Sequence, residues 1–185
     1  MGVMVKGQAL VAFERTLLEL KGDGAMAPLV PELPKELVQA IGSREILPMG
    51  WYPIEWFSAL HTAGQRAYGA TISREIGRAA TRHDVTTLYR FILRFMSPDT
   101  LVSQMSRILR MVVDSGEVVV EKKESGSALV KFSGCHGSNR GTWDDMLGSI
   151  EVLIELCGGR DVTGRIVAGG GDGDGAMSCQ LTWRT

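Results

Sequence analysis

The C-terminal stretch 114–185 constrains the fold more than any other part of the chain, because four strand-like segments surround one helix there. The segment EVVVE is β-branched, and Val130 and Phe132 alternate with polar neighbours, as in a strand with one buried face. The expected order is strand, strand, helix, strand, strand, at Glu117–Glu121, Ala128–Ser133, Thr142–Cys157, Asp161–Ala168 and Met177–Thr185. This order predicts a ββαββ unit with a four-stranded antiparallel sheet.

The upstream half has the spacing of helices. Leu10, Phe13 and Leu17 recur three and four residues apart, which is typical of an amphipathic helix. Expected helices are Lys6–Lys21, Pro34–Ile41, a segment ending near Tyr68, Ala70–His83, Val85–Phe95 and Pro98–Val113. The predicted fold class is therefore α+β, with a helical part (1–113) packed on a sheet part (114–185) in one compact domain.

Composition excludes several classes of function. With 20 Lys and Arg against 21 Asp and Glu, the net charge is −1, and the charges are mixed along the chain. Neither a nucleic-acid stripe nor a polybasic membrane segment is expected. Three scattered cysteines do not make a disulfide framework, so a reducing cytoplasm is the expected location. No apolar run reaches the ~20 residues of a membrane span, and the N-terminus does not have a signal-peptide pattern.

The sequence contains no evident catalytic constellation, so we expect no enzyme activity and no metal site. His61 and His83 are interpreted as structural helix residues. The adjacent Cys135 and His136 are the one pair that resembles chemistry, since a thiolate or a metal site could use both. No CxxC or HxxxH accompanies this pair, and a small enzyme that uses it remains an alternative.

Two clusters of charge have structural explanations. Asp144 and Asp145 lie near the start of the C-terminal helix, where carboxylates favour the positive end of the dipole. Arg74, Arg78 and Arg82 repeat every four residues and form one stripe along a helix. That stripe predicts salt bridges or a solvated face, with an anionic partner as the alternative.

A pocket, if present, would be lined by the apolar helix faces. The same residues could simply fill a core, and that alternative stays open. The candidates for binding a small apolar ligand are Trp56, Phe57, Leu60, Phe91, Phe95, Leu101, Met105 and Ile108.

Three segments together resemble an uncharacterised paralogous family of about 180–200 residues that is abundant in myxobacteria. These are Val5–Leu10 (VKGQAL), Trp51–Phe57 (WYPIEWF) and Cys179–Trp183 (CQLTW), the last following a helix like Trp143–Cys157. The resemblance covers nearly the whole chain.

The order of elements also resembles the heme nitric-oxide/oxygen-binding (H-NOX) sensor domains, which open on a Lys-Gly helix and end in a ββαββ unit. The resemblance implies a sensor-type fold with a pocket between helices and sheet. In those sensors a histidine on the helix before the first strand binds the iron, whereas Pro98–Val113 has none and Met105 falls near that place. Lys131–His136 lacks the Tyr-x-Ser-x-Arg motif that holds the heme. We therefore expect no cofactor, with heme held by another residue such as His61 as the alternative.

The leading functional hypothesis is a non-enzymatic signalling or regulatory domain. It would bind a small apolar ligand, a protein partner or a second copy of itself, but neither nucleic acid nor membrane. The alternatives are a heme- or metal-dependent gas or redox sensor and a structural homo-oligomeric scaffold subunit.

Overall fold

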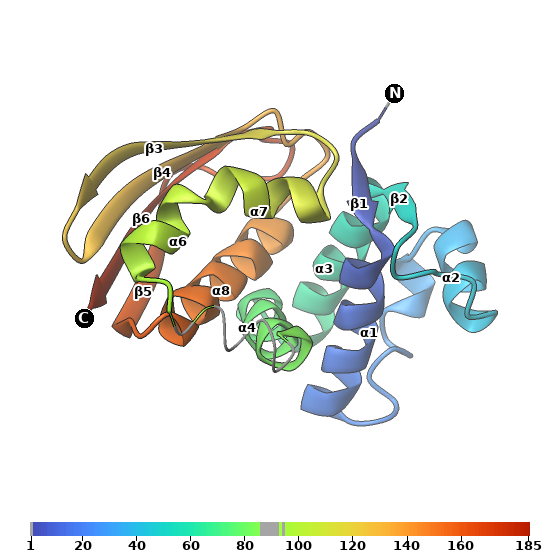
Figure 1. The fold of residues 1–185 in the computed structure, drawn as a ribbon. Coiled ribbons are helices and arrows are strands. Elements are labelled where there is room, and N and C mark those ends of the chain that lie inside the picture. The colour runs from blue at the N-terminus through green and yellow to red at the C-terminus, as the bar shows by residue number, and fades with distance from the viewer. Residues whose placement is uncertain (1, 86–92, 94) are drawn as a thin grey trace.

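A computed structural model describes residues 2–85, 93 and 95–185 of the chain (Figure 1). The elements of the N-terminal part are β1 (Met4–Lys6), α1 (Gly7–Lys21), η1 (Val30–Glu32), α2 (Lys35–Gly42), β2 (Trp51–Pro53), α3 (Ile54–Tyr68) and α4 (Ile72–Asp84). Those that follow are α6 (Pro98–Ser103), α7 (Met105–Val112), β3 (Glu117–Glu124), β4 (Ser127–Ser133), α8 (Arg140–Leu156), β5 (Arg160–Gly169) and β6 (Met177–Arg184).

The C-terminal sheet confirms the predicted α+β fold. Its four strands are antiparallel in the order β3-β4-β6-β5. Alternate residues of β6 are buried, because α6, α7 and α8 cover one face of the sheet (Figure 1). The buried set is Met177, Cys179, Leu181 and Trp183.

Two local expectations differ from the structure, and a third falls largely outside the described residues. The helix predicted over 98–113 is two helices, because the backbone leaves helical geometry at Gln104 (φ −98°, ψ 3°). Residues 51–53, for which no strand was predicted, pair with Met4–Lys6 in a second, two-stranded sheet. The helix expected over 85–95 lies largely outside the described residues.

Two hydrophobic cores lie on either side of α8. One lies between α8, the sheet and α6–α7, and the other is formed by α1, α3, α4 and the segment around α2. Helix α8 begins at a capping box, in which the Asn139 side chain accepts from Thr142 N and the Thr142 hydroxyl accepts from Asn139 N, both at 2.9 Å. This cap fixes where the helix starts between the two cores.

The expected salt bridges of the arginine stripe are present. Arg74 and Arg78 both contact Glu151 of α8, at 2.5 and 2.6 Å, and Arg78 and Arg82 both contact Glu155. Arg74 also donates to the Gly164 carbonyl of β5. This ionic ladder therefore ties α4 to α8 and to the edge of the sheet.

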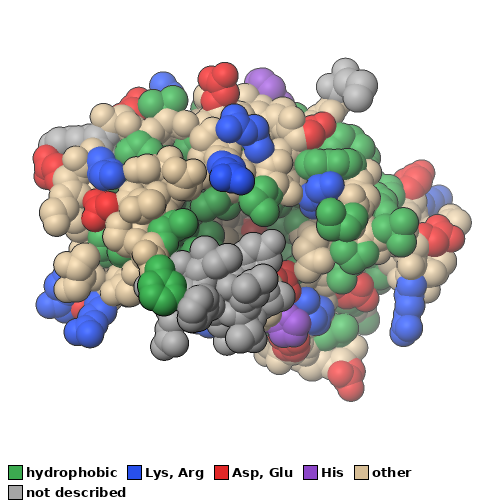
Figure 2. All heavy atoms as spheres, in the orientation of Figure 1, with side chains coloured by type: hydrophobic (Ala, Val, Ile, Leu, Met, Phe, Trp, Pro, Cys, Tyr) green, Lys and Arg blue, Asp and Glu red, His purple; other side chains and the backbone are tan. Residues whose placement is uncertain are grey.

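The surface gives no single-sign patch in the view of Figure 2. Basic and acidic side chains are interspersed there with apolar ones. Within the described residues, none of the helices has the length and apolar character needed to cross a membrane.

Candidate functional site

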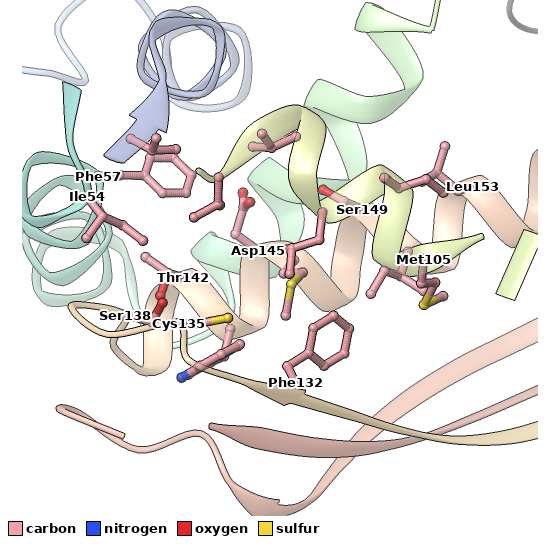
Figure 3. A pocket seen from close by; sticks show the side chains of 18 of the residues that line it. Ile54, Phe57, Met105, Phe132, Cys135, Ser138, Thr142, Asp145, Ser149 and Leu153 are labelled. Carbon is pink, nitrogen blue, oxygen red and sulfur yellow. The ribbon is translucent and has the colours of Figure 1, made fainter. Parts of the chain in front are cut away.

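A cavity of about 150 Å³ lies where the helical part meets the ββαββ unit (Figure 3). Its walls come from α6 and α7 on one side and α8 on the other, with β4 below and β1 and α3 at one end. Most of the lining is apolar. The lining residues are Val5, Ile54, Phe57, Leu101, Met105, Ile108, Leu109, Val112, Val113, Phe132, Cys135, Ser138, Thr142, Trp143, Asp145, Met146, Ser149, Ile150 and Leu153.

Four of the eight candidate pocket residues line this cavity. They are Phe57, Leu101, Met105 and Ile108. That they bind a ligand stays a prediction, because no bound molecule tests it.

The other four candidates lie elsewhere or are not described. Leu60 is fully buried but packs in the helical core, and Trp56 stacks on Tyr52 at 5.7 Å. Phe95 is 77% exposed, because the chain turns there before α6 begins. Phe91 lies outside the described residues. Helical periodicity therefore did not tell which of the two cores an apolar residue joins, nor that Phe95 is exposed.

The α8 side of the cavity was missed by the sequence analysis. Met146, Ile150 and Leu153 follow one another at four- and three-residue spacing and point one face of α8 at the cavity. The signal was present in the amphipathic pattern of 142–157, but that pattern does not tell whether an apolar helix face packs on the sheet or lines a cavity.

Asp145 is the unexpected polar residue of the lining. It was assigned to the helix dipole, yet its carboxyl lies among the apolar side chains of the cavity (Figure 3). Its neighbour Asp144 turns away and accepts from Arg140 at 3.0 Å. Within the described part of the chain, the Asp145 carboxyl has no hydrogen bond; its polar neighbour is His61 Nε2, 3.7 Å from Oδ1.

His61 lies beside this site and is fully buried. Its Nδ1 lies 3.0 Å from the Ser73 hydroxyl, and the rings of Phe13 and Phe57 meet it edge-on at 4.9 and 4.5 Å. Nε2 is buried without a hydrogen bond among the described residues. A separation of 3.7 Å is too long for a hydrogen bond to Asp145.

Burial makes both groups neutral near pH 7. Desolvation lowers the pKa of His61 to about 3 and raises the pKa of Asp145 to about 8. The pair is therefore a neutral imidazole beside a protonated carboxylic acid, and not an ion pair, although the distance alone would allow one.

Two glycines hold this pair in place by permitting close helix contacts. A Cβ at Gly77 of α4 would lie 2.0 Å from the Asp145 carbonyl oxygen. A Cβ at Gly141 of α8 would lie 2.6 Å from His61 Cβ. Real side chains cannot approach so closely, so both positions require glycine.

The loop before α8 is tied to α3 on the same side. The Asn139 amide donates to the Ser58 carbonyl and to the Thr62 hydroxyl, both at 2.8 Å, and Ser58 donates to the Gly137 carbonyl at 2.6 Å. These bonds fix the end of the cavity that Ile54 and Phe57 form.

The side chains of Cys135 and His136 lie in different environments, although the two residues are adjacent in the chain. Cys135 is buried and lines the cavity, whereas His136 is exposed. Burial raises the pKa of the Cys135 thiol to about 11, so it is protonated at neutral pH and unsuited to act as a nucleophile. Among the described residues, no group of three or more His, Cys, Asp or Glu is placed to hold a metal ion.

Comparison with solved structures shows the fold family. An oxygen-binding H-NOX domain related to soluble guanylate cyclases, in its oxygen complex, superposes with a TM-score of 0.63 at 14% identity over 97% of this chain and 95% of that one. The Fe(II) unliganded H-NOX protein from K. algicida gives 0.70 at 12% identity, covering 97% of both chains. A third structure, from work on heme redox potential and porphyrin distortion, gives 0.64 at 14% identity, covering 97% of this chain and 95% of that one.

The chain therefore has the H-NOX fold, as the order of its elements predicted. No protein-family model matches the sequence, and no curated protein matches it. The myxobacterial resemblance stays a prediction.

These comparisons overturn the expectation of no cofactor. Its basis was the absence of two sequence motifs, but the fold is shared with proteins described as Fe(II) and heme proteins. Heme is therefore a candidate cofactor for this chain.

The lining of the cavity offers four side chains that could donate to a heme iron. They are the Cys135 thiol, the Met105 and Met146 thioethers and the Asp145 carboxyl. The imidazole of His61 lies behind Asp145. Sites for drug-sized ligands occupy ~300–1,000 Å³, against about 150 Å³ here. The cavity as it stands does not fit a porphyrin.

Proposed function

We propose that this chain is a sensor-type ligand-binding domain whose ligand occupies the cavity between α6–α7 and α8. The observation that carries the proposal is the cavity itself, because natural cores are packed with few voids larger than a water molecule. An apolar void of ~150 Å³ is large enough to take benzene or xenon. The resemblance in fold to gas-binding sensor domains supports the same role.

The position of the cavity suits a sensor. Met105 and Ile108 of its wall belong to α7, a short helix that follows α6 at Gln104, and Met146 and Ile150 belong to α8, which contacts both cores. A ligand that fits better when α7 lies in one position shifts the population toward that position. The change would be read by a protein partner or a second copy of the chain.

The test is ligand binding with a variant that fills the cavity. Ile108→Phe should abolish the benzene-induced rise in melting temperature that the natural protein shows, since the larger ring takes the space. Ile41→Phe, on α2 and away from the cavity, is the matched control and should leave the rise unchanged. No rise in the natural protein, or an equal rise in both variants, would reject the proposal.

A heme-dependent gas sensor is the second candidate, favoured by the shared fold and by the sulfur donors Cys135 and Met105 in the lining. Heme titration of the purified protein decides it. A saturable Soret band that shifts in Cys135→Ser or Met105→Leu would support heme as the ligand. Its absence, together with benzene binding, would leave the apolar-ligand proposal.

The readout partner is tested separately. Light scattering across a range of protein concentrations, with and without ligand, distinguishes a homodimer from a monomer that signals to another protein. A mass of one chain throughout would reject the second-copy alternative.

A further inference from the structure

We propose that Asp145 is a polar anchor inside the cavity and that the ligand is a small apolar molecule with one neutral hydrogen-bonding group, such as a phenol or a short alcohol. This inference rests on the ligand-binding function proposed above and adds the chemical class of the ligand.

The first argument is that the carboxyl lacks a partner. Polar groups that are largely removed from water are nearly always hydrogen-bonded. The Asp145 side chain is only 16% exposed, is side by side with apolar lining residues and has no hydrogen bond within the described part of the chain. His61 Nε2, the polar atom nearest to it, is itself unpaired.

The second argument is that three other polar groups of the lining are already engaged. The Thr142 hydroxyl belongs to the capping box of α8, and the Ser149 hydroxyl donates to the Gly77 carbonyl at 3.2 Å. The Cys135 thiol faces the Ser133 carbonyl at 3.7 Å. These three groups are therefore not free to bond a ligand, whereas the Asp145 carboxyl has no hydrogen bond within the described residues.

The third argument concerns packing and charge. The close contact at Gly77 sets the backbone of Asp145, so its carboxyl is presented from a rigid helix. Among the residues that the structure describes, no basic side chain lines the cavity. A protonated carboxyl can donate one hydrogen bond and accept another, which matches a hydroxyl group. The pKa of Asp145, about 8, agrees with a neutral ligand.

Toluene and phenol make the test, because they differ by a methyl in place of a hydroxyl at nearly equal size. Calorimetry on the whole chain should show phenol binding at least as tightly as toluene. In Asp145→Leu, phenol should weaken about tenfold while toluene is unchanged, the loss of one hydrogen bond being worth about that factor. Asp145→Asn should keep part of the preference, and Ile41→Val, on α2 and away from the cavity, should keep all of it.

The outcomes separate the two proposals. If toluene binds but phenol does not, or if Asp145→Leu weakens both equally, the anchor is wrong and the cavity remains a ligand site. Tighter binding of benzylamine than of phenol would overturn the inference that the ligand's hydrogen-bonding group is neutral. If neither toluene nor phenol binds, the ligand-binding function fails and the anchor fails with it. Should Asp145→Leu not fold, the phenol-to-toluene ratio in the Asn variant carries the same decision.

Discussion

The two flanks of α8 differ in how they are packed. On the α4 flank, backbones approach closely at Gly77, and Arg74 and Arg78 clamp Glu151. On the α7 flank, apolar side chains leave a cavity of about 150 Å³. One side of the same helix is thus fixed by close packing and ionic contacts, and the other leaves room to adjust. The difference suggests that α8 is a fixed wall against which α6 and α7 can move.

The largest effect on stability should come from adding a methyl group on the closely packed α4 flank. Gly77→Ala places a Cβ on the Asp145 carbonyl oxygen, so the two helices must separate. We expect the free energy of unfolding to fall by about 3 kcal/mol, measured by urea denaturation. Gly24→Ala, where nothing lies within 4 Å, is the control and should change little. Equal effects at both positions would contradict the close packing.

Breaking the ionic ladder should have the next largest effect. Burial opposes ionisation of Glu151, but hydrogen bonds from Arg74, Gly164 N and Arg78 lower its pKa below the ordinary value. Glu151→Gln should cost about 2 kcal/mol at pH 7, and the difference from the natural protein should vanish as the pH falls through the lowered pKa. The exposed pair of Arg66 with Glu32 is the control, and Glu32→Gln should cost about 0.5 kcal/mol or less.

The cavity flank should show the opposite dependence on pH. Because the pKa of Asp145 is raised to about 8, the folded state holds a proton that the unfolded state releases near pH 4. Stability from this group is therefore greatest at low pH and is lost as the pH rises from about 4 to 8.

Asp145→Asn removes that titration. The stability of this variant relative to the natural protein should rise by about 1–2 kcal/mol as the pH is raised from 5 to 8. This is less than the full shift in the pKa of Asp145 implies, because water can enter the cavity. Thermal unfolding of both proteins across this range measures it. A constant difference at every pH would show that Asp145 is not neutral in the folded state.

The smallest effect on stability should come from shortening a side chain on the α7 flank, beside the cavity. Ile108→Val removes one methylene beside an existing cavity, where few contacts are lost, and should cost about 0.5 kcal/mol. Ile76→Val, in the fully packed helical core, should cost about 1 kcal/mol. Equal costs in chemical denaturation would mean that the two flanks are packed alike.

The fold was predictable because its signals are local and repeat along the chain. Alternation in 128–133 and 177–185 set the buried face of the sheet, and the order of elements predicted the ββαββ unit. The break at Gln104 was not predicted, because apolar residues continue at helical spacing on both sides of it. The pairing of β1 with β2 joins residues nearly fifty positions apart and has no local signal.

The site was harder to predict because it depends on contacts between distant elements. Periodicity identified Met105 and Ile108 as inward-facing but could not assign Leu60 to the other core. Asp145 had an adequate local explanation in the helix dipole, and its meeting with His61 becomes visible only when α3 and α8 are packed together. Missing motifs likewise misled the expectation about a cofactor, since the fold is conserved where sequence identity is only 12–16%.

Methyl NMR of the protein titrated with benzene tests the central claim most directly. The account predicts saturable shifts of the Leu101, Met105 and Ile108 methyl signals, which line the cavity, with those of Leu17 and Leu60 in the helical core unchanged. No saturable shift, or shifts of equal size in both cores, would contradict a ligand site on the α7 flank of α8.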